Sequence, residues 1–234
     1  MNTSLFGIIS EDIRFKEGLS ACMNCGVCTA ICPAAEFYDY DPRHICNVLL
    51  SRNDSSIEKL LEEETIWNCG QCLSCKTRCP RGNVPGLLIA VLRELAVRTG
   101  KFTSTTQGCQ QYAVKKTVGD NIINTGYCVH LMHVKPHLHP EQGPVWEWYY
   151  HNAESVSERL GANYNKDGAG ALRKIPDEDL DEIRRIFEVT GGKSFFETIE
   201  KFARDKAEKL NKNMSDTLEY DEFFYHVFVG ANQK

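Results

Sequence analysis

Eight of the eleven cysteines fall into two short runs with the same spacing. The runs are Cys22-Met-Asn-Cys25-Gly-Val-Cys28-Thr-Ala-Ile-Cys32-Pro33 and Cys69-Gly-Gln-Cys72-Leu-Ser-Cys75-Lys-Thr-Arg-Cys79-Pro80. Gaps of two, two and three residues before a Cys-Pro pair are typical of bacterial-type iron–sulfur proteins. Because the spacing occurs twice, with no insertion and no missing cysteine, we predict that the chain binds two [4Fe–4S] clusters.

The same spacing predicts which cysteines share a cluster. The first three thiolates of a run lie on a tight loop around one cubic cluster, while in two-cluster ferredoxins the Cys before the Pro ligates the other cluster. This crossed assignment places Cys22, Cys25, Cys28 and Cys79 on one cluster and Cys69, Cys72, Cys75 and Cys32 on the second. Crossed ligation would fasten the two runs together and keep the clusters close enough to exchange electrons.

Two alternatives to a redox role use the same residues. Zinc also binds four thiolates, but zinc sites usually pair two Cys-x-x-Cys units and leave no role for the third Cys or for the Cys-Pro pair. A redox-inert cluster that only holds the fold together is compatible with the spacing, although structural use seldom needs two cross-linked clusters. Electron transfer is therefore favoured, with the structural cluster as the alternative.

The composition indicates a folded protein of a reducing compartment. The 27 Lys and Arg residues and 32 Asp and Glu residues are interspersed, which predicts no nucleic-acid surface, and 42% hydrophobic residues are too many for a disordered chain. The most apolar stretch, 84–97, is too short to span a bilayer, and no export leader is visible. We expect the cytoplasm, where cysteines serve as metal ligands and not as a disulfide framework.

Helices are predicted to position the cysteine runs. Asp41 as N-cap and Pro42 in the first turn predict a helix through residue 49, and apolar residues on one face predict another over 56–64. Asn83 as cap and Gly100 as stop predict a helix over 83–98. Strand-type alternation is almost absent, so the predicted fold class is all-α.

The pair of runs linked by helices resembles the α-helical ferredoxin domain found in the C subunit of heterodisulfide reductase and in succinate dehydrogenase iron–sulfur subunits. Only 21 residues precede Cys22, which leaves no room for the plant-type [2Fe–2S] domain of the dehydrogenase protein. Larger relatives, such as glycolate oxidase iron–sulfur subunits, carry CCG domains with a Cys-Cys pair, and this sequence has no such pair. The heterodisulfide reductase C subunit is the closer resemblance.

The resemblance implies an electron-transfer subunit of an oxidoreductase complex that is no enzyme on its own. In a hetero-oligomer, it would relay single electrons between a flavin-containing A subunit and a catalytic, CCG-domain B subunit that acts on disulfide, thiol or sulfur substrates. The Hdr-like complexes of sulfur oxidation are the favoured type, because the chain is longer than a minimal subunit and shows no membrane anchor. The alternatives are an iron–sulfur subunit of a lactate, glycolate or succinate/fumarate flavoprotein, or a structural scaffold. No residue of this chain is predicted to be catalytic.

The resemblance covers residues 1–100, and residues 101–234 are predicted to be a mostly helical extension for subunit docking. Helices are predicted over 105–124 and 176–190, and a capping box at 194–197 predicts the start of another. The aromatic stretches 145–150 and 223–228 are interpreted as core, with a subunit interface as the alternative.

Three further cysteines and a group of histidines lie outside the runs. Cys46, Cys109 and Cys128 are predicted to be buried free thiols, and Cys46 is in addition a candidate to pack near a cluster and tune it without ligating it. His130, His133, His137 and His139 are interpreted as a polar loop, because their irregular spacing and the lack of nearby carboxylates disfavour a metal site.

Overall fold

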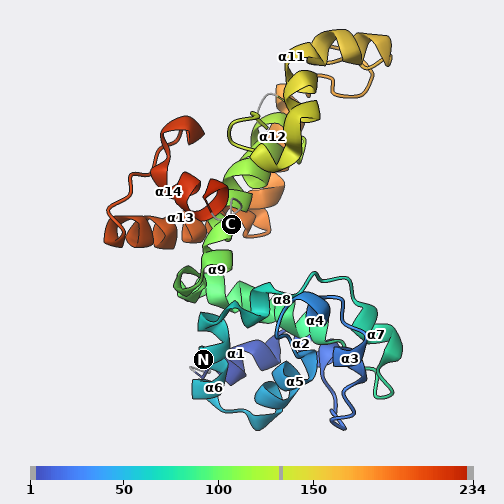
Figure 1. Cartoon of the computed structure of the whole chain (residues 1–234), viewed down its shortest axis with the longest axis vertical. Helices are drawn as coiled ribbons and strands as arrows, with labels where there is room; N and C mark the ends of the chain where they lie inside the picture. Colours follow the sequence, from blue (N-terminus) through green and yellow to red (C-terminus); the bar gives the residue numbers. More distant parts are fainter. Residues whose placement is uncertain (1–3, 132–133, 231–234) are drawn as a thin grey trace. The chain divides into compact units, whose positions relative to one another are not determined.

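The computed structural model describes residues 4–131 and 134–230, and no strand occurs in these ranges. The fold class is all-α, as the sequence predicts (Figure 1). The chain divides into two compact units, Met1–Gly108 and Cys109–Lys234. Within the described ranges, no helix has the length and apolar character needed to cross a membrane.

The first unit is built around α8 (Pro85–Arg98). Leu88, Ile89 and Leu92 are fully buried, and the helix is apolar on most of its circumference because neighbours surround it. The helices that pack against it are α1 (Leu5–Glu11), α2 (Ile13–Gly18), α5 (Pro42–Ser51), α6 (Asp54–Glu62) and α7 (Ser74–Arg78), with η1 (Glu64–Trp67) and η2 (Lys101–Ser104) (Figure 1). Gly100, with φ of 75°, ends α8 as predicted.

Two short helices belong to the cysteine runs. α3 (Val27–Ala30) from the first run packs against α7 from the second, so the packing of the unit brings the two runs together. α4 (Ala34–Phe37) follows the Cys-Pro pair of the first run. The two cysteine runs therefore lie side by side, although they are far apart in the sequence.

The predicted helix starts are right for α5 and need correction for α6 and α8. Asp41 caps α5 by accepting from the N–H of Arg43. α6 begins two residues earlier than predicted, because the side chain of Asn53 caps it. Asn83 does not cap α8, since its side chain accepts from the N–H of Ser20 and donates to the carbonyl of Ala21. Asn83 thus fixes the segment that leads into the first cysteine run.

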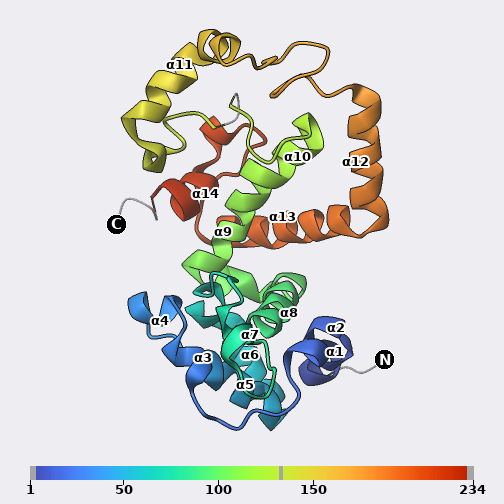
Figure 2. The ribbon, with the colours of Figure 1, turned by 90° about the vertical axis from the view of Figure 1, so that its right-hand side faces the viewer.

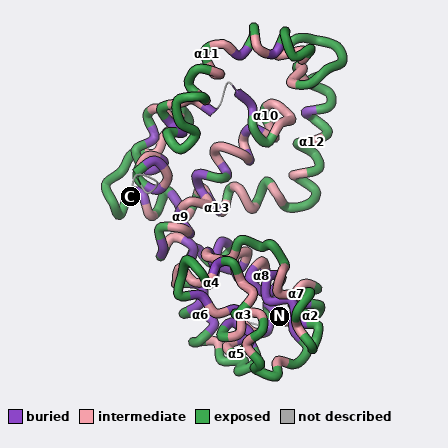
Figure 3. The backbone as a smooth tube through the Cα atoms, turned by 45° about the vertical axis from the view of Figure 1, so that its right-hand side comes forward, coloured by how far each residue is buried: buried purple, intermediate pink, exposed green. Residues whose placement is uncertain are grey.

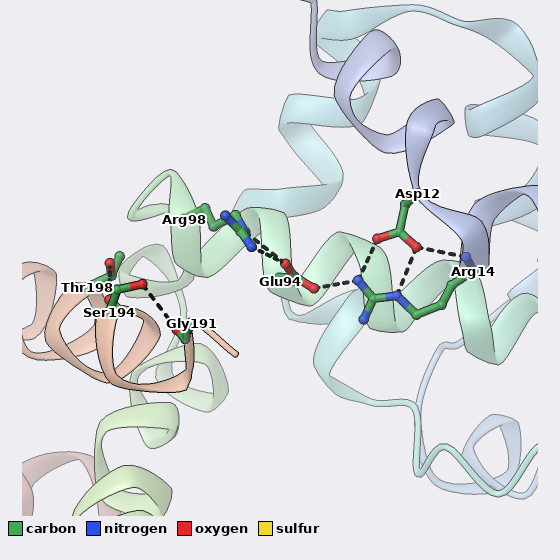
Figure 4. A network of polar contacts seen from close by, with 7 residues as sticks. All are labelled: Asp12, Arg14, Glu94, Arg98, Gly191, Ser194 and Thr198. Atoms are coloured by element: carbon green, nitrogen blue, oxygen red, sulfur yellow. Dashed lines mark hydrogen bonds and ion pairs between the residues drawn. The ribbon is translucent and has the colours of Figure 1, made fainter. Parts of the chain in front are cut away.

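A polar network ties the N-terminal helices to α8 (Figure 4). Arg14 donates to both Asp12 and Glu94, and Arg98 pairs with Glu94 at 2.6 Å. The hydrogen bond from Arg14 lowers the pKa of Asp12. Burial acts to raise the pKa of Glu94, but the hydrogen bonds from Arg14 and Arg98 lower it overall. Both carboxylates therefore stay ionised at neutral pH. Their contribution to the stability of the fold is lost only as the pH falls through their lowered pKa values.

The Glu94→Gln variant is expected to lower the free energy of unfolding at neutral pH by about 1 kcal/mol at low salt, because the pairs are partly exposed. The loss should shrink in about 1 M salt, which screens such charges. Thermal melts followed by circular dichroism measure both effects. The control is Glu63→Gln, which removes only an exposed pair with Lys59 and should change little. A loss that does not depend on salt would contradict an electrostatic origin.

A helical rod made of α9 (Thr106–Val114), a π-helical turn η3 (Lys115–Gly119) and α10 (Asp120–Thr125) belongs to the second unit from Cys109 onward. The rod confirms the helix predicted over 105–124, but the π-helical turn was not predicted. A Cβ at Gly119 would lie 2.7 Å from the ring of Phe196. The glycine therefore lets α13 pack closely against the rod.

α12 (Asp177–Val189) and α13 (Gly192–Lys209) meet at a corner (Figure 2). α12 confirms the helix predicted over 176–190, and Gly191, with φ of 81°, forms the corner. The predicted capping box is wrong, because Ser194 lies inside α13 and donates to the carbonyl of Gly191. The left-handed glycine already starts the helix, so the serine is not needed as a cap.

The two aromatic stretches differ in burial. Phe223 and Phe224 of α14 (Glu222–Phe224) are fully buried, which confirms the core interpretation, and η6 (Tyr225–Val229) continues from them. The interpretation is wrong for two residues of α11 (Gly143–Arg159), because Val145 is 76% exposed and Trp148 is 59% exposed. Figure 3 shows that α11 is largely exposed. Only a narrow strip of α11 that includes Ala153 is buried.

The cysteines and histidines outside the runs are partly as predicted. Cys109 is buried, whereas Cys128 is exposed and its predicted burial is wrong. The polar-loop interpretation is wrong for His130 and His139, which are 6% and 7% exposed and pack on aromatic rings. His139 also has a carboxylate partner, Glu141, at 3.0 Å. His133 lies outside the described residues.

Candidate iron–sulfur site

The structure arranges the eight predicted ligands around two hollows in the first unit. Cys22, Cys25, Cys28 and Cys79 line the first hollow, and Cys32, Cys69, Cys72 and Cys75 line the second. Each hollow takes three cysteines from one run and the Cys-Pro cysteine from the other. This grouping is compatible with crossed ligation, which stays a prediction until the ligands are tested.

Each hollow offers four thiols, which is the donor set of a cubic [4Fe–4S] cluster. Within residues 4–131 and 134–230, no group of three or more His, Cys, Asp or Glu side chains is placed to bind one metal ion. The four thiols of each hollow instead line one shared space together with mostly apolar neighbours. A cubic [4Fe–4S] cluster places its irons at separate corners and takes one thiolate at each. Zinc would need the sulfurs to converge on one point.

The two runs repeat a backbone conformation as well as a spacing. The residue before the second cysteine, Asn24 or Gln71, has φ of 60° or 50°. The residue after it, Gly26 or Leu73, has φ of 77° or 59°. Glycine adopts this conformation freely, whereas a leucine there costs about 1 kcal/mol. The second loop thus keeps the same shape against a backbone penalty, which indicates that the surrounding unit imposes that shape.

Backbone N–H groups point at the first sulfur of each run. The N–H of Asn24 lies 3.4 Å from the Sγ of Cys22, and the N–H of Gln71 lies 3.3 Å from the Sγ of Cys69. Such donors stabilise the negative charge of a thiolate and help to orient it. The loops are therefore shaped to hold anionic sulfur.

A fifth cysteine lines the first hollow. Cys46 lies on α5 and is 1% exposed, which confirms both its predicted burial and its predicted place beside the cysteine runs. Burial raises the pKa of its thiol, and the neighbouring Cys22 and Cys28 raise it further. Cys46 should therefore remain a neutral thiol. Arg43 and Arg81 also line this hollow, and Arg43 is held by Asp41 at 3.0 Å.

Sequence reasoning missed two residues at the second hollow. Tyr40 lines it together with Cys69 and is 3% exposed. Arg93 lies behind the same cysteine and donates to the carbonyl of Cys69 at 2.7 Å. The sequence held one indication of Arg93, since Arg93 and Glu94 are the two charged residues of the apolar stretch 84–97. Nothing in the sequence marks Tyr40.

A hollow of the second unit has a different lining. It is lined mainly by polar side chains of the segments 124–130 and 165–177, among them Asn124, His130 and Arg173. No cysteine lines it. Both hollows lined by four cysteines lie in the first unit.

Comparison with known proteins points to the same part of the chain as the two hollows. Residues 18–83 match the 4Fe-4S dicluster domain. The chain is 51% identical over 92 residues to the C subunit of ferredoxin:CoB-CoM heterodisulfide reductase from Methanosarcina acetivorans, which covers 38% of this chain and 36% of that protein. It is 30% identical over 109 residues to the second iron-sulfur C subunit of CoB–CoM heterodisulfide reductase from Methanocaldococcus jannaschii, covering 46% and 55%. It is also 30% identical over 122 residues to the C subunit of H(2):CoB-CoM heterodisulfide,ferredoxin reductase from Methanothermobacter marburgensis, covering 51% and 60%.

These matches confirm the resemblance to the heterodisulfide reductase C subunit over the cysteine-containing region. They also support [4Fe–4S] binding by this region. The chain spans between 36% and 60% of the length of these three relatives.

Proposed function

Because residues 18–83 match a 4Fe-4S dicluster domain, we propose that this chain is an electron-transfer subunit of a heterodisulfide-reductase-like complex and carries two [4Fe–4S] clusters. The observation that supports this most is the pair of adjacent hollows, each lined by four cysteines. Pro85 lines both hollows, so a single residue separates them at that point. Two clusters held this close could exchange electrons directly.

The proposed ligands are Cys22, Cys25, Cys28 and Cys79 for the first cluster and Cys69, Cys72, Cys75 and Cys32 for the second. Each cluster, when bound, would accept and return one electron. Protein residues would supply the thiolates and the N–H groups that face them. Cys25 and Cys72 are exposed, so both clusters would reach the surface where a partner can dock.

The proposed partners are a flavin-containing A subunit and a CCG-domain B subunit of a heterodisulfide-reductase-like hetero-oligomer acting on disulfide, thiol or sulfur substrates. A sulfur-oxidation complex and a cytoplasmic location remain the favoured predictions. The second unit offers exposed apolar side chains on α11, Val145 and Trp148, which supports its proposed role in docking.

A redox relay can be separated from a structural scaffold by counting electrons. The purified chain is reduced with dithionite, freed of reductant and titrated anaerobically with ferricyanide. A relay with two clusters should return about two electrons per chain. Clusters that return no electrons would support the scaffold alternative.

Partner identity needs a different experiment. The tagged chain is purified anaerobically from its own cells, and the proteins that accompany it are identified by mass spectrometry. A flavin-containing protein together with a protein that has CCG domains should be recovered. Recovery of a lactate-, glycolate- or succinate-oxidising flavoprotein instead would support that alternative.

A further inference from the structure

The two hollows have different surroundings, although their cysteine loops are alike. Tyr40 lines the second hollow together with Cys69 and Cys32, and it is 3% exposed. Tyr40 thus faces one cysteine from each run. A tyrosine hydroxyl is a hydrogen-bond donor at neutral pH, so Tyr40 can donate to a sulfur that lines this hollow.

Arg93 adds a positive charge on the same side. Its guanidinium donates to the carbonyls of Ile66, Trp67 and Cys69 at 2.8, 2.9 and 2.7 Å. It also lies over the ring of Trp67, 5.4 Å from the centroid. The three hydrogen bonds fix the charge directly behind the segment that carries Cys69. In a partly buried position such a charge is screened less than at the surface.

The groups that line the first hollow are different. The buried polar groups there are the thiol of Cys46, a weak donor, and the amide of Asn83, which already bonds Ser20 and Ala21. The charged groups are Arg43, whose side chain is 39% exposed and neutralised by Asp41, and Arg81, which is exposed. Solvent screens both charges more than it screens the charge of Arg93.

We propose that Tyr40 and Arg93 are positioning residues that raise the reduction potential of the second cluster above that of the first. Reduction adds one negative charge to a cluster, and a hydrogen bond to a ligating sulfur or a fixed nearby cation stabilises the reduced form more than the oxidised form. One electron given to the pair would therefore rest on the second cluster, and electrons would pass from the first to the second. This inference rests on the proposed function, because it requires two reducible clusters.

The test is a potentiometric titration of the Tyr40→Phe chain, followed by electron paramagnetic resonance. The substitution removes one hydroxyl and keeps the ring, so the packing at this buried position is retained. One of the two midpoint potentials should fall and the other should stay. Tyr38→Phe is the matched control, because Tyr38 is 49% exposed and lines neither hollow, and it should shift neither potential.

Arg93→Gln provides a second measurement that does not depend on the tyrosine. Removal of the charge should lower the same midpoint potential that Tyr40→Phe lowers. To identify the cluster, both substitutions are repeated in a chain that lacks Cys22 and Cys79 and so keeps only the second cluster. The shift should persist there.

The outcomes separate this inference from the proposed function. Two reducible clusters whose potentials do not respond to either substitution would overturn the inference and leave the relay intact. A shift confined to the first cluster would overturn it as well. A wild-type chain without two reducible clusters would overturn the proposed function itself.

Discussion

A chain in which Cys22 and Cys79 are both replaced by alanine should keep iron and sulfide for one [4Fe–4S] cluster. A chain in which Cys22 and Cys32 are both replaced should keep none. Under crossed ligation the first pair serves a single cluster, whereas the second pair takes one ligand from each. The hollows group the cysteines in this way, although Cys22 and Cys32 are much closer in sequence.

Iron and acid-labile sulfide per chain measure this difference after anaerobic reconstitution. Ligation within each run would give the reverse result, with one cluster left in the Cys22/Cys32 variant and none in the Cys22/Cys79 variant. The control is Cys128→Ala, because Cys128 is exposed and lies in the second unit, and this chain should keep the wild-type iron content. The two double variants have the same number of cysteines, so general destabilisation cannot produce opposite results.

The second large effect concerns a buried carboxylate of the second unit. Asp221 is fully buried, caps α14 by accepting from the N–H of Phe224 at 2.7 Å, and accepts from the hydroxyl of Tyr112. The Asp221→Ala variant should lose about 3 kcal/mol of unfolding free energy, because it removes a cap and leaves the buried Tyr112 hydroxyl without its acceptor. Phe223 and Phe224 would then lose the turn that buries them.

Chemical denaturation of the full chain measures this loss. Asp216→Ala is the matched control, since Asp216 is exposed in the same segment, and it should change stability by less than about 0.5 kcal/mol. Equal effects of the two substitutions would show that the buried contacts of Asp221 contribute nothing.

The cysteine runs and the helices around them could be predicted because the signals that define them lie close together in the sequence. Cluster spacing, the Asp41 cap and the Gly100 stop depend on residues within one or two turns, and the structure contains the helices that they predict. Asn83 shows where local information fails. Its type and position fit an N-cap, but the partners that decide its role, Ser20 and Ala21, lie more than 60 residues away in the sequence.

The second unit was harder to predict because its decisive contacts are between distant segments. Composition alone could not predict that Phe223 is buried and Trp148 is exposed, since both residues lie in aromatic stretches. The division of the chain into a cluster domain and a docking extension stays a prediction. Tyr40 and Arg93 likewise could be identified only from the fold, which places both residues beside Cys69.

The central claim is that this chain holds two [4Fe–4S] clusters that exchange electrons. It is tested most directly by electron paramagnetic resonance of the anaerobically purified chain before and after dithionite, with iron and sulfide counted on the same sample. We expect about eight irons per chain and, after reduction, the spectrum of two spin-coupled clusters. Zinc in place of iron, or the spectrum of two reduced clusters with no coupling between them, would contradict the claim.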